Sequence, residues 1–260
     1  MTIVRSHLYV YAVIGGRPTR VLSGLPTLPD GSPPRLVALD DTLSLVVADV
    51  PAAIYSPAAL DRRLADPKWV SRCGTAHHAV SEALAKRDAV IPLRFLTLFS
   101  NEAKAVSTLK RSRAKLVKTL ARVKGREEWV LRIGTPDPRR ATAAGQPSRA
   151  GADASSGTAF LRAKADARRL ARERTKRVAA DAMRVFETLQ KVADQATTRP
   201  VEPGLGVLLD AALLVKKRNM PALRRSLARA AAGLLEEGCP VSLTGPWPAY
   251  SFAALRERHG

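Results

Sequence analysis

Apolar, aromatic and β-branched residues at the start of the chain predict strands before any helix. Residues 7–14 form such a run and end at a pair of glycines, as a strand that leads into a turn does. Two short apolar runs, 36–40 and 43–50, meet at an Asp-Asp-Thr sequence and predict a hairpin. From residue 67 the apolar positions recur at steps of three and four, which predicts a helix with one buried face.

The next part of the chain alternates between strand and helix patterns. Residues 90–99 form an apolar run interrupted by Pro92, so we expect a strand with an irregular or edge position at the proline. Residues 101–124 predict a basic helix, and residues 128–133 predict the strand that closes this half. The mixed order predicts an α+β fold, with helices backing a sheet in an N-terminal ferredoxin-like domain.

A segment without a hydrophobic pattern divides the chain. Residues 135–157 consist largely of Pro, Gly, Ser, Ala and Arg, with almost nothing to bury, and predict a flexible linker or a long loop. We therefore expect an N-terminal domain over residues 1–134 and a C-terminal α/β domain over residues 158–260.

The C-terminal domain is expected to open on a long helix. Residues 158–198 lack Pro and Gly and are rich in good helix formers. In the second half of this segment the apolar residues recur in a heptad-like stripe, so we expect a coiled-coil-like seam in that half. In the first half, Lys164 and Arg168 occupy the positions that would continue the stripe. The stripe consists of Val178, Ala182, Val185, Leu189, Val192 and Ala196.

The pattern of the remaining residues predicts a strand at 206–215, a helix at 221–236 and a strand at 240–244. An aromatic segment, Gly-Pro-Trp-Pro-Ala-Tyr-Ser-Phe, follows at 245–252. Prolines on both sides of Trp247 hold the backbone near polyproline II geometry. Two interpretations stay open. The rings plug a core or a domain junction, or they form an exposed anchor for a protein partner.

The chain is strongly basic, and its charge is unevenly spread. Its 260 residues include 43 Lys and Arg and 23 Asp and Glu, a net charge of +20, with 46% hydrophobic residues. The hydrophobic content excludes a wholly disordered chain, and no apolar run reaches the length of a membrane span. Residues 101–124 carry eight basic and one acidic residue, and residues 158–199 carry eleven basic and five acidic. Such charge is typical of proteins with an anionic partner.

Signatures of catalysis and of metal binding are missing from the sequence. There is no phosphate-binding loop, dinucleotide motif, GxSxG or HExxH sequence. His77 and His78 have no second group at ligand spacing, which favours a helix-surface or core-edge pair. Cys73 and Cys239 lie far apart and are expected to be reduced, buried thiols. We expect no enzyme activity, no cofactor and no metal.

Nucleic-acid binding is the alternative that the charge suggests. The helices predicted at 101–124 and 158–177 could follow a phosphate backbone. Readers of single strands also need aromatic rings for stacking, and residues 101–124 contain none. The alternative reading of such charge runs is a solvated helix face.

Several stretches, in order along nearly the whole chain, resemble the gas vesicle accessory proteins of the GvpL/GvpF family. The last of them is highly specific. The chain departs from the family at Leu96, where glycine commonly follows the Arg-Phe pair, and in its unusually long linker. The matching stretches are 7–11 (HLYVY), His77-His78, 90–95 (VIPLRF), 128–130 (EWV), 157–161 (GTAFL) and 243–252 (LTGPWPAYSF).

The resemblance implies a two-domain protein, with a ferredoxin-like domain followed by an α/β domain that carries a coiled-coil element. It also implies a non-enzymatic minor component of gas vesicles, present in the cytoplasm before assembly. Such proteins are thought to contact the small hydrophobic shell protein and other accessory proteins during nucleation and assembly; no membrane partner is expected. Whether the chain is of the F or the L type stays open. We expect partner contacts at Trp247, Tyr250, Phe252, Val185, Leu189 and Val192.

Overall fold

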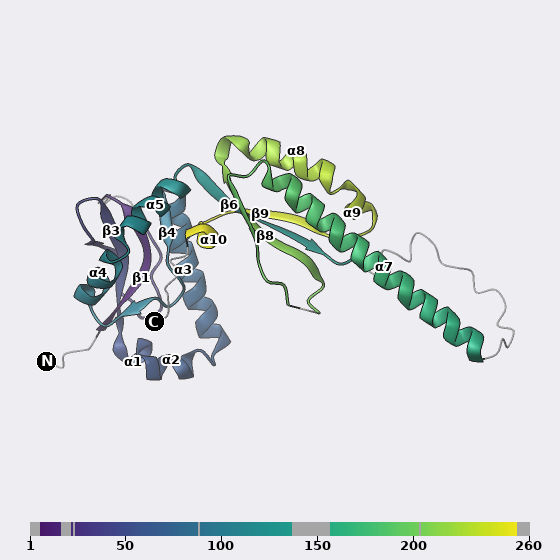
Figure 1. The fold of residues 1–260 in the computed structure, drawn as a ribbon. Coiled ribbons are helices and arrows are strands. Elements are labelled where there is room, and N and C mark those ends of the chain that lie inside the picture. Colours follow the sequence, from purple (N-terminus) through teal and green to yellow (C-terminus); the bar gives the residue numbers. More distant parts are fainter. Residues whose placement is uncertain are drawn as a thin grey trace. The chain divides into compact units, whose positions relative to one another are not determined.

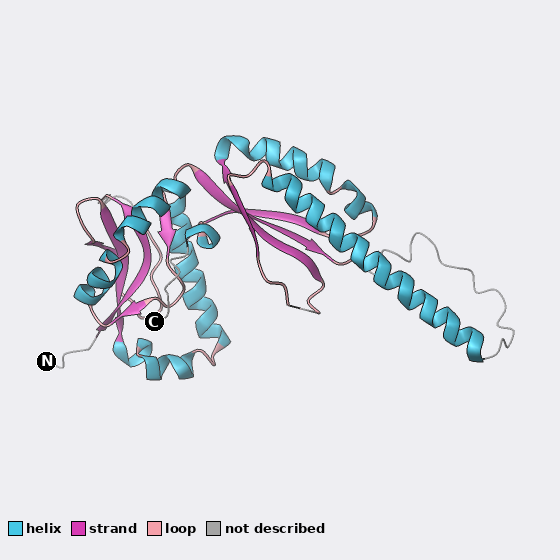
Figure 2. Cartoon of the chain, in the orientation of Figure 1, coloured by secondary structure: helices cyan, strands magenta, loops and turns pink. Residues whose placement is uncertain are grey.

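The chain forms two compact units, each described here by itself. The computed structural model describes residues 6–16, 22, 24–87, 89–136, 157–202 and 204–253. The first unit comprises Met1–Glu128 and Pro246–Gly260, and the second comprises Trp129–Gly245. Each unit combines an antiparallel sheet with helices (Figures 1 and 2), which confirms the predicted α+β class.

The central strand of the first unit is the first strand of the chain. Within the described residues the sheet has the order β2-β3-β1-β4, and β5 also pairs with β1. The partners β3, β4 and β5 all run antiparallel to β1. Residues 8–14 of β1 are buried, which explains their unbroken hydrophobic run. The strands are β1 (Ser6–Gly15), β2 (Arg35–Ala38), β3 (Leu43–Pro51), β4 (Val90–Pro92) and β5 (Leu98–Phe99).

Helices cover this sheet, and one of them has the predicted buried face. Helix α3 buries Trp69, Cys73 and His77 at steps of four, followed by Val80 and Leu84. The helix predicted at 101–124 is two helices, because the chain turns where the amide of Ser112 donates to the carbonyl of Leu109. The helices are α1 (Ala52–Tyr55), α2 (Pro57–Arg63), α3 (Pro67–Arg87), α4 (Glu102–Lys110), α5 (Arg113–Val123) and α10 (Tyr250–Ala253).

The second unit is built on a sheet with the order β7-β8-β6-β9. Its core contains Leu131 and Ile133 of β6 together with the apolar face of α7 and strand β8. The helix predicted at 221–236 is divided into α8 and α9. The elements are β6 (Arg126–Gly134), α7 (Gly157–Gln190), β7 (Gln195–Thr198), β8 (Val207–Lys216), the 3₁₀ turn η3 (Lys217–Asn219), α8 (Met220–Ala230), α9 (Ala232–Glu236) and β9 (Val241–Trp247).

The two units divide the chain differently from the predicted boundaries at 134 and 158. Strand β6, expected to close the first half, lies between β8 and β9, because its alternating apolar residues complete the second core. The segment from residue 246 onward belongs to the first unit. Of the predicted linker, residues 137–156 lie outside the described residues, so its flexibility stays a prediction.

Helix α7 ends at Gln190 rather than at residue 198. The chain turns there, the amide of Asp194 donates to the carbonyl of Leu214, and residues 195–198 pair with β8. The β-branched threonines of this segment suit a strand better than a helix. The apolar stripe of α7 packs against its own unit, where α7 and α8 lie side by side (Figure 1). A seam with another chain is not needed to bury it.

Two observations bear on the other expectations from the sequence. Cys73 and Cys239 are both buried free thiols, and burial raises the pKa of each. Within the described part of the chain, no helix has the length and hydrophobicity needed to cross a membrane.

Leu189 tests the packing of α7, because its side chain is inaccessible to solvent whereas Met183 on the same helix is 42% exposed. Leu189→Ala should lower the free energy of unfolding by about 2–5 kcal/mol, since it opens a cavity in the second core. Met183→Ala should change it by less than about 1 kcal/mol. Urea unfolding followed by circular dichroism measures both. Equal losses in the two variants would show that Leu189 is not a core residue.

Candidate partner-binding site of the first unit

A buried histidine lies at the centre of the first unit's aromatic residues. His77 of α3 is 3% exposed, and its Nδ1 lies 2.8 Å from the hydroxyl oxygen of Tyr9 on β1. That oxygen also accepts a hydrogen bond of 3.2 Å from the amide of Leu96. A neutral imidazole protonated at Nε2 would accept the Tyr9 proton, so the three groups form one chain of hydrogen bonds.

Burial sets the charge state of this pair. It lowers the pKa of His77 to about 4, because the site disfavours the imidazolium. It also raises the pKa of the Tyr9 hydroxyl well above its usual value. Both groups are therefore neutral near pH 7. The backbone of Leu93 raises the pKa of His77 by less than burial lowers it.

Rings from three separate segments surround His77. The imidazole stacks on Tyr11 at a centroid distance of 5.9 Å and meets Phe95 edge to face at the same distance. The ring of Tyr250 in α10 lies 6.3 Å away. Aromatic pairs at these separations stabilise beyond the area that they bury. Stretches far apart in the sequence thus meet at one place.

A strained turn joins this cluster to the segment between β4 and β5. The amide of Thr97 donates to the carbonyl of Arg94, and Leu96 between them has a φ of 61°. This left-handed conformation costs roughly 1–2 kcal/mol for a residue with a side chain, which is why glycine suits the position. Because the amide of Leu96 bonds to Tyr9, the buried pair helps to hold the turn.

The C-terminal segment is attached to the first unit through a buried carboxylate. Glu128 is 2% exposed, and its two oxygens accept 2.8 Å hydrogen bonds from the amide and the hydroxyl of Ser251. The guanidinium of Arg122 donates to the carbonyl of Phe252. Hydrogen bonds to charged groups are stronger than neutral ones, so this anchor fixes the position of α10.

A cavity adjoins the same segment. Its volume is about 550 Å³, and it is lined by residues 92–99 together with Leu109 of α4 and Tyr250 of α10. The lining includes the apolar side chains of Leu93, Phe95 and Phe99. The strained turn and the C-terminal segment therefore form parts of one wall.

The structure brings together one half of the predicted contact residues. Trp247 is 39% exposed and stacks obliquely on His78 at 5.3 Å, Tyr250 is half-buried, and Phe252 is buried, all in the first unit. Val185 and Leu189 lie in the core of the second unit, and Val192 packs against that core. A partner role for any of the six stays a prediction.

Sequence reasoning missed the groups that build the site, chief among them Tyr9, His77, Glu128 and Ser251. The aromatic stretch at 7–11 and the His pair were visible as motifs, but their contacts were not. Glu128 carried one usable signal, since an acid that directly precedes the apolar pair of Trp129 and Val130 needs a polar partner once it is buried.

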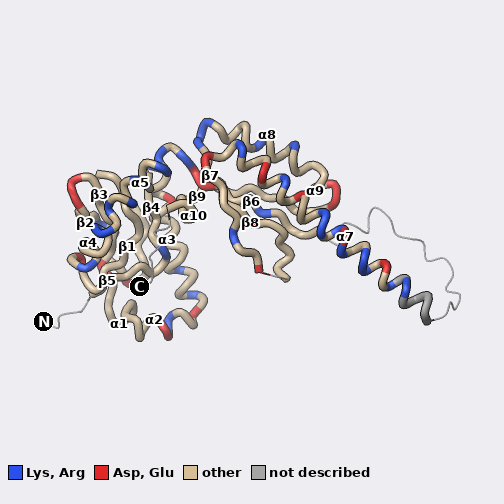
Figure 3. The backbone as a smooth tube through the Cα atoms, in the orientation of Figure 1, with Lys and Arg blue, Asp and Glu red and all other residues tan. Residues whose placement is uncertain are grey.

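The basic residues form no such built site. Figure 3 shows Lys and Arg along α4, α5 and the first part of α7. In the first unit Arg113 pairs with Asp40, and Arg35 pairs with Asp49 and Glu102. The part of the chain that the structure describes contains no group of three or more His, Cys, Asp or Glu that could hold a metal.

Comparisons with known proteins agree on one family. The model of the family described as gas vesicle synthesis protein GvpL/GvpF matches residues 7–254. A gas vesicle protein L from Streptomyces sp. is 33% identical over 262 aligned positions, which cover 96% of this chain and 93% of the relative.

Solved structures share the fold. The crystal structure of gas vesicle protein GvpF from Anabaena sp. has a TM-score of 0.68 at 18% identity, covering 98% of this chain and 99% of that one. The GvpF structure from Microcystis aeruginosa has a TM-score of 0.62 at 15% identity, covering 96% and 99%. The fold, the converging motifs and these matches define a gas vesicle protein. The chain belongs to the GvpL/GvpF family, and it is involved in gas vesicle formation.

The buried His77 makes stability depend on pH. Its pKa of about 4 in the folded chain lies below the value of about 6.5 for a free histidine, so between these values the unfolded chain binds more protons. Stability should be full above about pH 6.5 and fall toward pH 4, losing about 2 kcal/mol between pH 6.5 and 5.

Urea unfolding at a series of pH values measures this loss. The variant His77→Gln has no imidazole at this position and should lose the pH dependence in this window. His7→Gln leaves the buried pair intact and should keep the wild-type slope. A wild-type stability that stays constant from pH 6.5 to 5 would contradict the buried, neutral state of His77.

Proposed function

We propose that the protein is a non-enzymatic accessory factor that binds the small hydrophobic shell protein and other accessory proteins during vesicle nucleation and assembly. One observation carries the proposal. The C-terminal aromatic segment is anchored by Glu128, and its Tyr250 helps to line a cavity of about 550 Å³. Trp247 of the same segment is 39% exposed. Trp and Tyr are the residues that most often dominate protein interfaces.

The chemistry of the proposed partner suits this surface. A subunit that builds a gas-tight wall exposes apolar surface before it assembles, and such surface aggregates unless it is covered. The cavity offers apolar side chains, including Phe95 and Phe99, together with the ring of Tyr250. An apolar segment of the shell protein would bury those rings and gain most of its binding free energy from the area removed from water.

A binding role also accounts for the polar groups near the cavity. His77 is buried and neutral, its Nδ1 faces Tyr9, and Glu128 is used in holding Ser251. These hydrogen bonds hold the backbone of the site in place. None of them pairs a nucleophilic side chain with a general base. In this proposal the protein acts in the cytoplasm before assembly and on the growing vesicle.

Nucleic-acid binding remains the alternative function. Its support is the charge on α4, α5 and the first part of α7, which belong to different units. The two proposals differ in salt dependence. Affinity for nucleic acid falls steeply with salt because counterions are released, whereas apolar burial depends on salt only weakly.

Trp247→Ala tests the proposed contact with the shell protein. The full chain is tagged and co-expressed with the shell protein, and the amount of shell protein that co-purifies is measured. The Trp247→Ala variant should recover at least fivefold less shell protein than wild type, because truncating an aromatic anchor typically costs 2 kcal/mol or more, roughly thirtyfold in affinity. Leu64→Ala is the matched control, since Leu64 is a 50% exposed apolar residue of the same unit. It should recover as much as wild type.

The melting curve of each variant establishes that the first unit is folded. A folded Trp247→Ala variant that recovers the wild-type amount of shell protein would remove Trp247 from the interface. Recovery of shell protein that falls equally in both variants would show that the loss is not specific to the aromatic segment.

A further inference from the structure

The first part of α7 extends away from the core of its own unit. Residues 162–177, the basic arm, precede Val178, which is the first buried residue among the described side chains of the helix. Every arm side chain that the structure describes is exposed except that of Arg174, which is half-buried. Figure 1 shows this part of α7 beyond the strands of its sheet. Among the described residues, the arm is supported mainly near its end, where Arg174 and Arg177 pair with Glu237.

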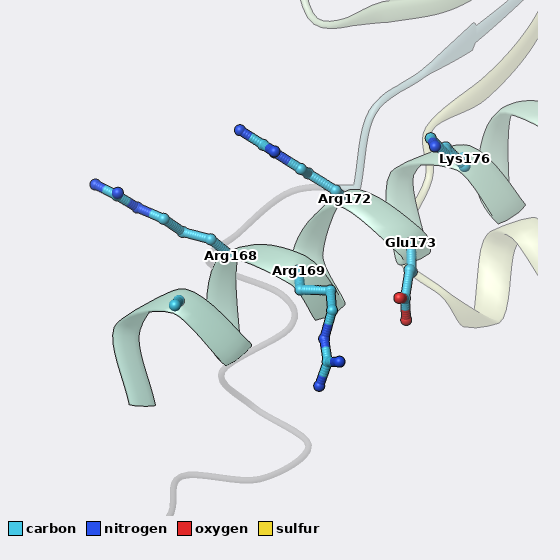
Figure 4. A pocket seen from close by; sticks show the side chains of 6 residues that line it. Arg168, Arg169, Arg172, Glu173 and Lys176 are labelled. Atoms are coloured by element: carbon cyan, nitrogen blue, oxygen red, sulfur yellow. The ribbon is translucent and has the colours of Figure 1, made fainter. Parts of the chain in front are cut away.

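The arm carries a row of like charges. Lys164, Arg168, Arg172 and Lys176 follow one another at steps of four, so they lie on one side of the helix and repel one another. Figure 4 shows Arg168 and Arg172 pointing the same way, while Arg169 and Glu173 point elsewhere.

No carboxylate in the described chain pairs with any residue of this row. The neighbouring cations differ, since Arg169 pairs with Asp166 and both Arg174 and Arg177 pair with Glu237. Three successive like-charge contacts destabilise this exposed part of the helix. A ligand with negative charges at the same spacing would relieve that repulsion.

The face beside the row is made of small side chains. Ala171 and Thr175 continue the register of the buried stripe of α7, and both are exposed. Leu170, 61% exposed, is the only large apolar side chain of the described arm. A partner therefore approaches closely at the small residues, but it gains little from apolar burial. Its affinity must come mainly from charge.

We infer that the basic arm binds an acidic α-helix of a partner protein, one whose carboxylates recur every four residues. Four residues of any α-helix rise about 6 Å, so the carboxylates of such a helix match the four cations along about 18 Å. Small residues beside the row permit a short distance between the two helix axes.

Duplex DNA fits the same surface less well. A phosphate strand winds around its axis, so it follows a straight row of cations only over a short distance. The arm contains no aromatic ring that could stack on a base and no Asn or Gln for contacts with adenine. This surface lies in the second unit, and its binding does not rest on the proposed contact with the shell protein.

The test measures binding of labelled peptides to the full chain by fluorescence anisotropy at about 50 mM salt. One helical peptide of alanine and glutamate has Glu at every fourth position, and a second has the same composition with Glu spread over all faces. The arm variant replaces the four cations of the row by glutamine, which removes their charge and is itself a good helix former. Its substitutions are Lys164→Gln, Arg168→Gln, Arg172→Gln and Lys176→Gln.

A matched control removes the same charge elsewhere. Four exposed cations of the first unit that pair with no carboxylate among the described residues serve as the control. Circular dichroism checks that the helices of both variants persist. The control substitutions are Lys110→Gln, Arg111→Gln, Lys115→Gln and Lys118→Gln.

The row peptide should bind the wild-type chain about tenfold more tightly than the scrambled peptide, as expected for four exposed ion pairs. The arm variant should lose about that factor, and the control variant should stay within about twofold of wild type. Equal losses in both variants, or equal binding of the two peptides, would reduce the effect to net charge and overturn the inference. Tighter binding of a short DNA duplex, lost in the arm variant, would assign the surface to nucleic acid instead.

Discussion

The hydrogen bonds between Glu128 and Ser251 are the interaction on which the site of the first unit depends. A carboxylate that is 2% exposed is costly to bury unless its oxygens are satisfied, and the amide and hydroxyl of Ser251 satisfy both. Loss of the Ser251 hydroxyl would remove one of these hydrogen bonds, and loss of the Glu128 carboxylate would remove both. The anchor therefore keeps the C-terminal segment on the first unit after the chain has passed through the second.

From this anchor the rest of the site follows. With α10 held in place, Tyr250 reaches the ring cluster around His77 and forms part of the cavity wall. The Tyr9 hydroxyl joins that cluster to the amide of Leu96 and so to the strained turn. A site assembled from such distant segments is positioned by the folded unit, so a partner would meet surfaces that are already ordered.

The sequence predicted the elements better than their pairing. Strands β1 and β8 agree with their predicted ranges within one residue at each end, and helix α3 begins at the predicted residue 67. Each of these elements carries a strong local pattern of apolar residues. The sheet to which β6 belongs was not predictable, since alternating apolar residues look the same in either sheet. The end of α7 was missed because its apolar period continues into β7.

The site was only partly predictable for a similar reason. The aromatic segment and the histidine pair stood out as motifs, but the contact between Glu128 and Ser251 joins residues 123 positions apart. Leu96, which stands where the family commonly has glycine, still adopts the left-handed backbone conformation. For α7, the sequence showed both the fading of the stripe and the cations that replace it, and the structure adds that this part of the helix is exposed.

Hydrogen exchange of the full chain, alone and with the shell protein, tests most directly that residues 92–99 and the C-terminal segment form one binding site. Both segments should gain protection together when the shell protein is added, because they line the same cavity. Binding of the shell protein that leaves exchange in both segments unchanged, or that protects only the second unit, would contradict the account.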